Sequence, residues 1–192
     1  MTKGRVAGAL AAALVLLAVL ATTPKAVPGY AQVRRTAASS EARLLARDGR
    51  VLEVRRTDAD VRRLDWVPLA AVSAALRTRI AASEDRRFQG HSGVDWRAVA
   101  GALRERVAGD AARGASTITM QLAALLDPTL GSAGDRSWRQ KIMQGRAALA
   151  IERRWSKDEI LEAWLNLLPF RGDLVGVDAA ARGLAEIGRA HV

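Results

Sequence analysis

The sequence predicts a mainly α-helical domain. Apolar residues recur at spacings of three and four in successive segments after Pro68, as on the buried face of a helix. Residue types that cap helices precede these segments, and strand-like alternation is confined to one short stretch. The 192 residues are enough for one domain with its own core and a further tail.

Residues 1–24 are predicted to form a cytoplasmic start and a transmembrane signal anchor. Residues 6–24 carry no charge, are mostly Ala, Leu and Val, and lie between Arg5 and Lys25. About 20 apolar residues cross a bilayer, and positive charge ahead of them places the N-terminus in the cytoplasm and the rest outside. A cleaved signal peptide is the alternative, with residues 19–21 as the best cleavage site.

Residues 25–43 are predicted to be a linker, because they are rich in Ala, Pro, Thr and Ser. A short β-hairpin is expected over residues 44–54, with Asp48 and Gly49 forming its turn. The domain itself is expected to begin at this hairpin.

Three predicted helices follow the hairpin. Pro68 fits the first position of the first helix, Asp95 is the expected N-cap of the second, and the third follows Gly114. Their apolar stripes are Leu69, Val72, Leu76 and Ile80; Trp96, Val99, Leu103 and Val107; and Ile118, Leu122, Leu125 and Leu126.

The clearest helix begins after Ser156. Ser156 and Glu159 have the spacing of a capping box, and Asp158 adds an acid to the first turn. Pro169 ends the helix. Its buried face is predicted to comprise Ile160, Leu161, Trp164, Leu165 and Leu168. Glu162 and Asn166 lie four residues apart on this helix and are expected to tie it to a neighbouring element.

The stretch 84–96 has the composition of a site. It places Glu84, Asp85, Phe88 and His91 in a turn after a predicted helix. A carboxylate that takes a proton from a sugar hydroxyl is a better base when burial raises its pKa, and the run 80–83 is expected to supply such a setting. The alternative is a charged helix end, with Phe88 in the core, Asp85 capping a helix or paired with an arginine, and His91 as a hydrogen-bonded structural histidine.

A second candidate segment runs from Gly114 to Leu126. Ser116 and Thr117 stand at the start of the predicted helix, where free backbone amides favour an anion. The alternative is ordinary N-capping by Ser or Thr. Gln121 lies in a polar row beside the buried stripe.

These two segments, in this order and separation, resemble the first two motifs of glycosyltransferase family 51, the peptidoglycan transglycosylases of class A penicillin-binding proteins and their monofunctional relatives. Residues 138–155, 156–166 and 169–180 resemble the third, fourth and fifth motifs, and the resemblance covers about residues 44–184. It implies a lysozyme-like transglycosylase domain, behind the anchor in the bacterial inner (cytoplasmic) membrane, on the extracytoplasmic side of a single-pass protein.

The resemblance also implies the reaction. Glu84 would be the general base that takes a proton from the acceptor sugar while lipid II is polymerised into β-1,4 glycan strands and undecaprenyl pyrophosphate leaves. Lipid II, the growing strand, membrane lipids and cell-wall synthesis proteins are the implied partners. The implied substrate-binding residues are Asp85, Phe88, His91, Ser116, Thr117, Gln121, Lys141, Gln144, Arg146, Arg153 and Arg154.

The net charge of +10 is carried almost wholly by arginine and suits anionic lipid headgroups or a pyrophosphate. The alternative for each of these arginines is a solvated basic face or the codon bias of an arginine-rich genome. One tyrosine and two phenylalanines give little surface for stacking bases, so no nucleic-acid partner is expected. The absence of cysteine excludes disulfides and thiolate metal sites.

Two departures from the family pattern stand out. Gln144 occupies the position of a second glutamate that assists the donor pyrophosphate or a divalent metal, and Ala124 and Leu125 replace a lysine and an asparagine. Both the glutamine and the missing asparagine resemble the penicillin-binding protein 1C branch. No cofactor is certain, and Mg²⁺ or Mn²⁺ is left open.

The end of the chain departs from the family pattern after Leu184, and residues 185–192 are expected to be a non-native tail. We therefore expect a domain that is incomplete at its C-terminus and inactive by itself, with apolar faces around Leu161, Trp164, Leu165 and Val177 left in water. Two other function classes stay open. One is a lytic transglycosylase or muramidase that cleaves glycan, and the other is a non-catalytic membrane-anchored scaffold.

Overall fold

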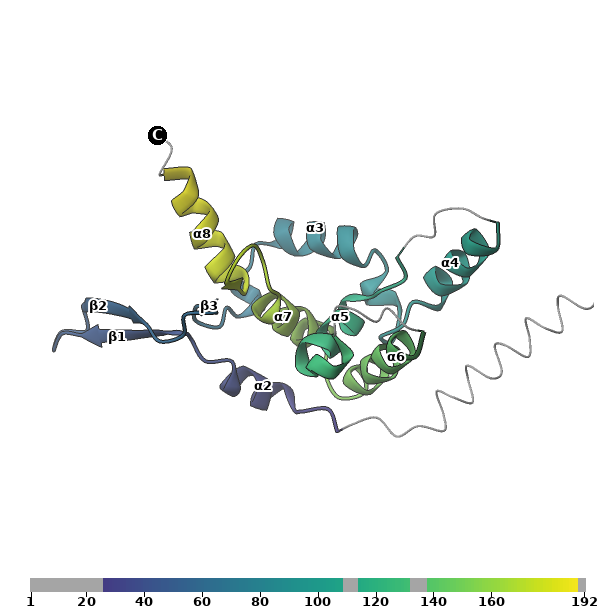
Figure 1. The fold of residues 1–192 in the computed structure, drawn as a ribbon, viewed down its shortest axis with the longest axis horizontal. Coiled ribbons are helices and arrows are strands. Elements are labelled where there is room, and N and C mark those ends of the chain that lie inside the picture. The colour runs from purple at the N-terminus through teal and green to yellow at the C-terminus, as the bar shows by residue number, and fades with distance from the viewer. Residues whose placement is uncertain (1–25, 109–113, 132–137, 190–192) are drawn as a thin grey trace, which may run out of the picture.

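The computed structural model describes residues 26–108, 114–131 and 138–189, and it is mostly helical, as predicted (Figure 1). At its centre α5 (Ile118–Leu126) packs against α6 (Trp138–Glu152) and α7 (Lys157–Leu167). Ile118 and Leu122 of α5 and Ile160 and Leu165 of α7 have no exposed surface. The predicted apolar stripes of α5 and α7 therefore form the core.

Thr117 caps α5, as the alternative interpretation of that segment expects, and the capping box predicted for α7 is confirmed. The Thr117 hydroxyl accepts a hydrogen bond from the Met120 amide at 3.1 Å, which satisfies one of the free amides at the start of α5. Ser156 and Glu159 form the expected capping box at the start of α7, and that helix ends two residues before Pro169.

The expectation of uncovered apolar faces on α7 is wrong. Leu161, Trp164 and Leu165 are at most 5% exposed, because they lie in one cluster with α5, with α6 and with residues nearer the N-terminus. Val177 packs against the same cluster and is partly buried. The N-terminal part of the cluster is Val33, Leu69 and Val72, together with Tyr30 and Trp66 at its edge.

The predicted linker over residues 25–43 is wrong from Tyr30 onward. Residues Tyr30–Thr36 form α2, and β1 already begins at Glu41. Val33 of α2 is buried, and the Tyr30 hydroxyl donates a hydrogen bond to Glu162 of α7. A composition typical of a linker did not reveal these contacts with a distant helix.

Glu162 and Asn166 tie α7 to neighbouring segments, as predicted. Besides Tyr30, Glu162 accepts hydrogen bonds from the Trp66 indole and the Leu69 amide, both at 2.6 Å. Asn166 exchanges two hydrogen bonds with the Val67 backbone, at 2.8 and 2.9 Å. Two polar residues one turn apart thus hold residues 66–69 against the core.

The predicted hairpin is confirmed and starts three residues earlier than expected. Strands β1 (Glu41–Leu45) and β2 (Val51–Arg56) pair antiparallel, with Gly49 at φ +83° in the turn. A positive φ is a conformation that glycine adopts without strain. The hairpin projects from the helical body, and every residue of β2 is exposed (Figure 1).

A continuous helix from Pro68 is wrong. Leu69–Ala71 form a short 3₁₀ turn, η1, and α3 (Ala74–Glu84) starts afresh with Ser73 as its N-cap. Leu69 and Val72 are buried as expected, whereas no residue of α3 is buried. The predicted apolar stripe is therefore buried in and just after η1 and is not buried in α3.

Helix α4 (Trp96–Ala108) begins after Asp95, whose carboxylate accepts a hydrogen bond from the Ala98 amide at 3.0 Å. The predicted N-cap is confirmed, but the predicted buried stripe is wrong in two places. Trp96 and Leu103 are each 55% exposed, and only Val99 packs against buried residues, Val94, Met120 and Ala148. The side chain of Val107 lies outside the described part.

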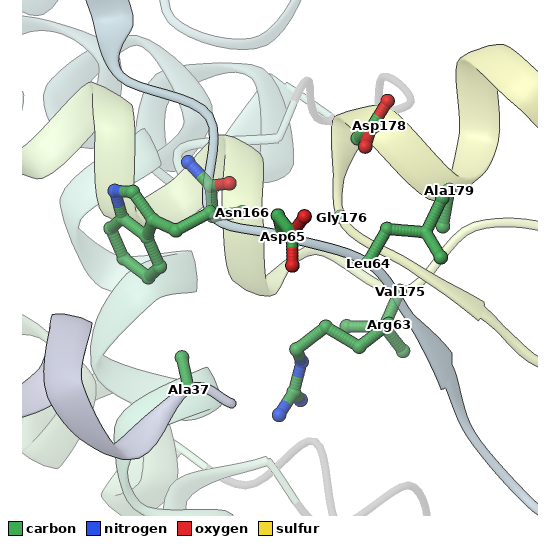
Figure 2. Close-up of a pocket in the computed structure, with 10 residues that line it drawn as sticks. Ala37, Arg63, Leu64, Asp65, Asn166, Val175, Gly176, Asp178 and Ala179 are labelled. Atoms are coloured by element: carbon green, nitrogen blue, oxygen red, sulfur yellow. The ribbon is translucent and has the colours of Figure 1, made fainter. Parts of the chain in front are cut away.

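A two-stranded parallel sheet joins residues far apart in sequence, β3 (Arg62–Arg63) and β4 (Leu174–Val175). Helix α8 (Val177–Arg189) follows it and continues past Leu184, the expected end of the domain. A shallow hollow beside this sheet, too narrow to admit a water molecule, is lined by Arg63, Asp65, Asn166 and Gly176 among others (Figure 2).

The predicted membrane anchor lies in residues 1–25, outside the described residues. Among residues 26–108, 114–131 and 138–189, no helix has the length and apolar character needed to cross a membrane.

Candidate active site

Asp85 joins the turn after α3 to the start of α5. Asp85 is 6% exposed, and each of its carboxylate oxygens lies 3.0 Å from His91 Nε2. Its Oδ2 also accepts a hydrogen bond from the Ile118 amide at 3.1 Å. The Gly93 amide donates to His91 Nδ1 at 3.2 Å, so the neutral ring carries its proton on Nε2, facing Asp85. A negative charge here also complements the positive end of the α5 dipole.

The amides at the start of α5 are largely taken by the protein itself. Asp85 accepts from Ile118, and Thr117 accepts from Met120 while its hydroxyl donates to the Gly93 carbonyl at 2.6 Å. The expectation of free amides for an anion is therefore wrong at two of the first three helical positions. Thr117 and Asp85 act as the capping and pairing residues of the alternative interpretation, and both are buried.

Gly93 brings the turn into direct contact with α6. Its φ is +96°, and a Cβ atom added there would lie 2.8 Å from the backbone of Ala148. Such an approach excludes any side chain. Val94 then packs on Met120 and Ala148, so the turn is fixed to α5 and α6 together.

Glu84 is the only exposed carboxylate among the three acids of this turn, since Asp85 and Asp95 are buried. Its Oε2 accepts a hydrogen bond from Gln121 Nε2 at 3.2 Å, and Gln121 Oε1 accepts one from the Trp164 indole at 3.0 Å. The expectation that residues 80–83 bury Glu84 is wrong, because α3 presents no buried side chain. An exposed carboxylate is, however, open to an incoming hydroxyl group.

Asp95 is held by Arg87, whose Nε and Nη2 each lie 2.8 Å from Asp95 Oδ2. Burial opposes the charge of Asp95, but hydrogen bonds from Arg87 and the Ala98 amide outweigh it and lower the pKa of Asp95. This ionised acid therefore fixes the far end of the turn at the start of α4.

Phe88 begins the 3₁₀ turn η2 (Phe88–Gly90) and is 1% exposed, which places it in the core. Lys157 Nζ lies 4.5 Å from the centre of its ring and donates to the His91 carbonyl at 2.6 Å. The same ammonium pairs with Glu152 Oε1 at 2.6 Å, to which the Thr119 hydroxyl donates at 2.7 Å. This partly buried network, which we call the clamp, holds the turn against α6 and α7.

Sequence analysis missed Lys157 and Glu152 as parts of the site. One signal was present: Lys157 is in the first turn of α7, where the helix dipole disfavours a cation. A cation in that position requires a partner from elsewhere, and here the partners are Glu152, Phe88 and the backbone of His91.

Lys141 and Ser116 lie together at the other side of the α5 start. Lys141 Nζ donates to Ser116 Oγ at 2.7 Å and to Gln144 Oε1 at 3.1 Å, while Gln144 Nε2 donates to the carbonyl of Leu130, the last residue of η3 (Pro128–Leu130), at 2.6 Å. Lys141 is exposed, so it is accessible to an anionic ligand.

A divalent metal does not fit this donor set. The oxygen of Gln144 faces the Lys141 ammonium, and a neutral amide cannot neutralise a metal cation. Within the described part of the chain, no group of three or more His, Cys, Asp or Glu side chains is placed to hold a metal ion.

The three predicted arginines differ in their surroundings. Arg146 is 4% exposed and contacts Met143 Sδ at 3.5 Å within α6, so it is closed to a bulky ligand. Arg154 donates to the Val27 carbonyl at 2.9 Å, on the N-terminal segment, and Arg153 is exposed. The structure thus brings together Glu84, Gln121, Asp85, His91, Thr117, Ser116, Lys141 and Gln144 around α5.

Comparison with known proteins points to one family. Residues 48–185 match the family model described as transglycosylase. The chain is 44% identical over 119 residues to a biosynthetic peptidoglycan transglycosylase of Rhodospirillum centenum, covering 61% of this chain and 49% of the relative. A protein of the same description from Pasteurella multocida is 39% identical over 117 residues, or 61% and 46% of the two chains. The chain spans about half the length of the curated relatives it matches.

Proposed function

Because this chain belongs to the transglycosylase family, we propose that it is a peptidoglycan glycosyltransferase. It polymerises lipid II into β-1,4 glycan strands and releases undecaprenyl pyrophosphate. The single observation that carries this proposal is the exposed Glu84 carboxylate, set beside a turn whose other acids are buried and paired. The description of the relatives as biosynthetic peptidoglycan transglycosylases supports it.

Glu84 acts as the general base. It takes the proton from the 4-hydroxyl of the acceptor sugar as that oxygen attacks the anomeric carbon of the donor chain. The bond from this carbon to the lipid pyrophosphate breaks, and the pyrophosphate leaves with the electron pair. A sugar hydroxyl is too weak an acid to ionise beforehand, and a positioned base is worth roughly a hundred- to ten-thousandfold in rate.

Lys141 is the cation best placed to receive the leaving pyrophosphate. It is exposed, and it donates a hydrogen bond to Ser116 just before α5. Gln121 of the same helix donates a hydrogen bond to Glu84, the proposed base. A fixed cation stabilises the charge that develops on the leaving group. Arg146 is buried, and Arg154 donates to the Val27 carbonyl, so we assign them no part in this step.

No step is assigned to a metal ion. The Lys141 ammonium already faces the Gln144 oxygen, at the position where the family pattern has an acid. We propose that this ammonium replaces metal assistance, and that the protein belongs to the penicillin-binding protein 1C branch. Gln144, Leu125 and the sequence from Ser116 to Pro128 support that placement.

The proposed location is the extracytoplasmic face of the bacterial inner membrane, with residues 6–24 as the anchor. The lipid tail of the substrate requires a site near the bilayer, and a net charge of +10 favours anionic headgroups. The growing glycan strand and other cell-wall synthesis proteins are the further partners of this proposal.

Labelled lipid II and purified cell wall, each incubated with the protein in detergent, test the proposal. The expectation of an inactive chain rested on uncovered apolar faces around Leu161, Trp164 and Leu165, and these residues are buried. We therefore expect glycan polymer from lipid II and no cleavage of cell wall. Glu84→Gln is expected to reduce polymerisation at least a hundredfold. The matched control is Glu53→Gln on the exposed strand β2, which is expected to keep the full rate.

Two results would overturn the proposal. Cleaved glycan without polymer would identify a lytic enzyme, and neither product would identify a scaffold. Retention of most of the rate by Glu84→Gln would remove Glu84 from the mechanism while leaving the activity itself established.

A further inference from the structure

Trp164 lies in the core of the protein and reaches toward the proposed base through one intermediate residue. It is 2% exposed in the middle of α7, and its indole N–H donates to Gln121 Oε1 at 3.0 Å. Gln121 Nε2 in turn donates to Glu84 Oε2 at 3.2 Å. Three residues from three different helices thus form one chain of hydrogen bonds, which ends at the exposed carboxylate.

We infer that Trp164 is a positioning residue for Glu84 and acts by fixing the orientation of the Gln121 amide. This inference rests on the proposed function, because it concerns the geometry of the base in that reaction. Trp164 itself touches no reacting atom.

The chemistry of the indole group determines the orientation. An indole N–H can only donate a hydrogen bond, so it must face the oxygen of the Gln121 amide. The amide nitrogen is then directed at Glu84, where it donates to the carboxylate. Without a fixed donor, the two ends of a glutamine amide can exchange places by a half turn.

Glu84 depends on this contact more than its neighbours do. It ends α3, which buries none of its residues, and Gln121 supplies its only hydrogen bond to a side chain in the described part of the chain. Asp85 by comparison is fixed by His91 and the Ile118 amide. Gln121 therefore connects the exposed base to the core, and Trp164 is the buried core residue that binds Gln121.

Loss of the indole N–H is expected to affect turnover more than substrate binding. A Gln121 amide that turns its oxygen toward Glu84 repels the carboxylate and displaces it from the acceptor hydroxyl. Small displacements of a reacting group cost large factors in rate, whereas contacts made by the rest of the substrate are unchanged.

The first test compares Trp164→Phe with Trp155→Phe in the full chain. Trp155 is a matched control, because it is also buried in the central core and its indole also donates one hydrogen bond, to the Pro28 carbonyl at 3.2 Å. We expect both variants to unfold at lower temperature. Only Trp164→Phe is expected to lower kcat for lipid II polymerisation, roughly five- to twentyfold, with KM within about twofold.

Gln121→Met provides the second test, because it removes the amide while keeping the side-chain length. The double variant with Trp164→Phe is expected to have the same kcat as Gln121→Met alone, since both changes break one chain of contacts. A multiplicative loss in the double variant would overturn the inference and leave the proposed function standing. So would an unchanged kcat in a folded Trp164→Phe variant.

A readout independent of activity completes the design. The indole N–H signal of Trp164, resolved by ¹⁵N labelling of the five tryptophans, is expected to shift and to exchange faster with solvent in Gln121→Met. The Trp155 signal serves as the internal control. An unmoved Trp164 signal would overturn the inference even if the wild-type chain polymerises lipid II. Failure of the wild-type chain to polymerise would overturn the proposed function, and the hydrogen-bond chain would then be judged on this signal alone.

Discussion

Tyr30 and Glu162 offer a direct test of how the N-terminal segment is attached to the helical core. Tyr30 is the only tyrosine of the chain, and its hydroxyl donates to Glu162 of α7. Burial, together with this hydrogen bond and the charge of Glu162, raises the pKa of Tyr30 from 10.0 to about 12. Burial would also raise the pKa of Glu162, but hydrogen bonds from Trp66, Tyr30 and the Leu69 amide lower it.

The sign of the pH dependence follows from these directions. The folded state favours neutral Tyr30, so its contribution to stability is complete below pH 10 and is lost as the pH rises from about 10 to about 12. Glu162 is favoured as the anion, so its contribution is present above the usual pKa of about 4.3 and is lost as the pH falls below it.

The magnitude is bounded by the same shift. A midpoint moved from near 10 to near 12 corresponds to at most about 2.7 kcal/mol. Tyr30 is only partly buried, however, and water screens its interaction with Glu162, so we expect about 1 kcal/mol. Glu162→Gln also removes a charged acceptor from Trp66 and Leu69, and its total cost is expected to be about 1–3 kcal/mol.

Tyrosinate absorbance gives the assay, because a single tyrosine reports a single titration. We expect a midpoint near 12 in the folded protein and near 10 in denaturant, with a lower midpoint in folded Glu162→Gln. Circular dichroism over the same pH range controls for unfolding. A midpoint near 10 in a protein that is still folded would show that α2 is not attached to α7 as described.

Two further predictions concern the clamp and the metal. Lys157→Met leaves the Glu152 carboxylate buried without its cation and is expected to destabilise the protein by about 3–5 kcal/mol in urea unfolding, whereas Lys157→Met combined with Glu152→Leu is expected to recover part of that loss. A double variant as unstable as Lys157→Met would contradict this account. Polymerisation is expected to change little when a chelator removes Mg²⁺ and Mn²⁺, and Gln144→Glu is expected to increase the dependence on either metal. Strong inhibition of the unaltered protein by the chelator would disprove the role assigned to Lys141.

Local signals in the sequence indicated the starts of α4, α5 and α7 correctly. Ser156 with Glu159, Thr117 and Asp95 all cap the helices assigned to them, because a cap involves only residues within one turn. The apolar stripe of α5 was equally reliable, since that helix is surrounded by others and its periodicity has no competing cause.

The failures share a physical cause, which is dependence on distant parts of the chain. Helix α2 follows Gly29 without a side-chain cap, and its place is set by contacts of Tyr30 and Val33 with residues more than 100 positions away. The stripe from Leu69 to Ile80 matched a single helix, yet Ser73 caps a new one at the break. No local pattern distinguishes a linker from α2, or one continuous helix from η1 followed by α3.

In the candidate site, too, local features were predicted and features that depend on distant residues were not. The residue types were predicted. The sequence did not show that Asp85 is the buried acid and Glu84 the exposed one, because Asp85 is bound by the first amide of α5, that of Ile118. Lys157 was missed because its partners, Glu152 and the His91 carbonyl, come from other elements. The sequence thus indicated the residue types, while tertiary contacts determined that Glu84 is exposed and Asp85 is buried.

The contacts that hold the turn after α3 explain why the hydrogen bond from Gln121 to Glu84 is critical. Asp85 binds α5, Gly93 contacts α6, and Lys157 of α7 binds the His91 carbonyl, so three helices fix the turn by separate contacts. Loss of any one of these contacts leaves the other two in place. Glu84 stands just before this clamped stretch, at the end of a helix without buried residues. Among the residues that the structure describes, only Gln121 connects the Glu84 side chain to the core. We therefore expect changes in the clamp to appear mainly as lost stability, and changes in Trp164 or Gln121 mainly as lost turnover.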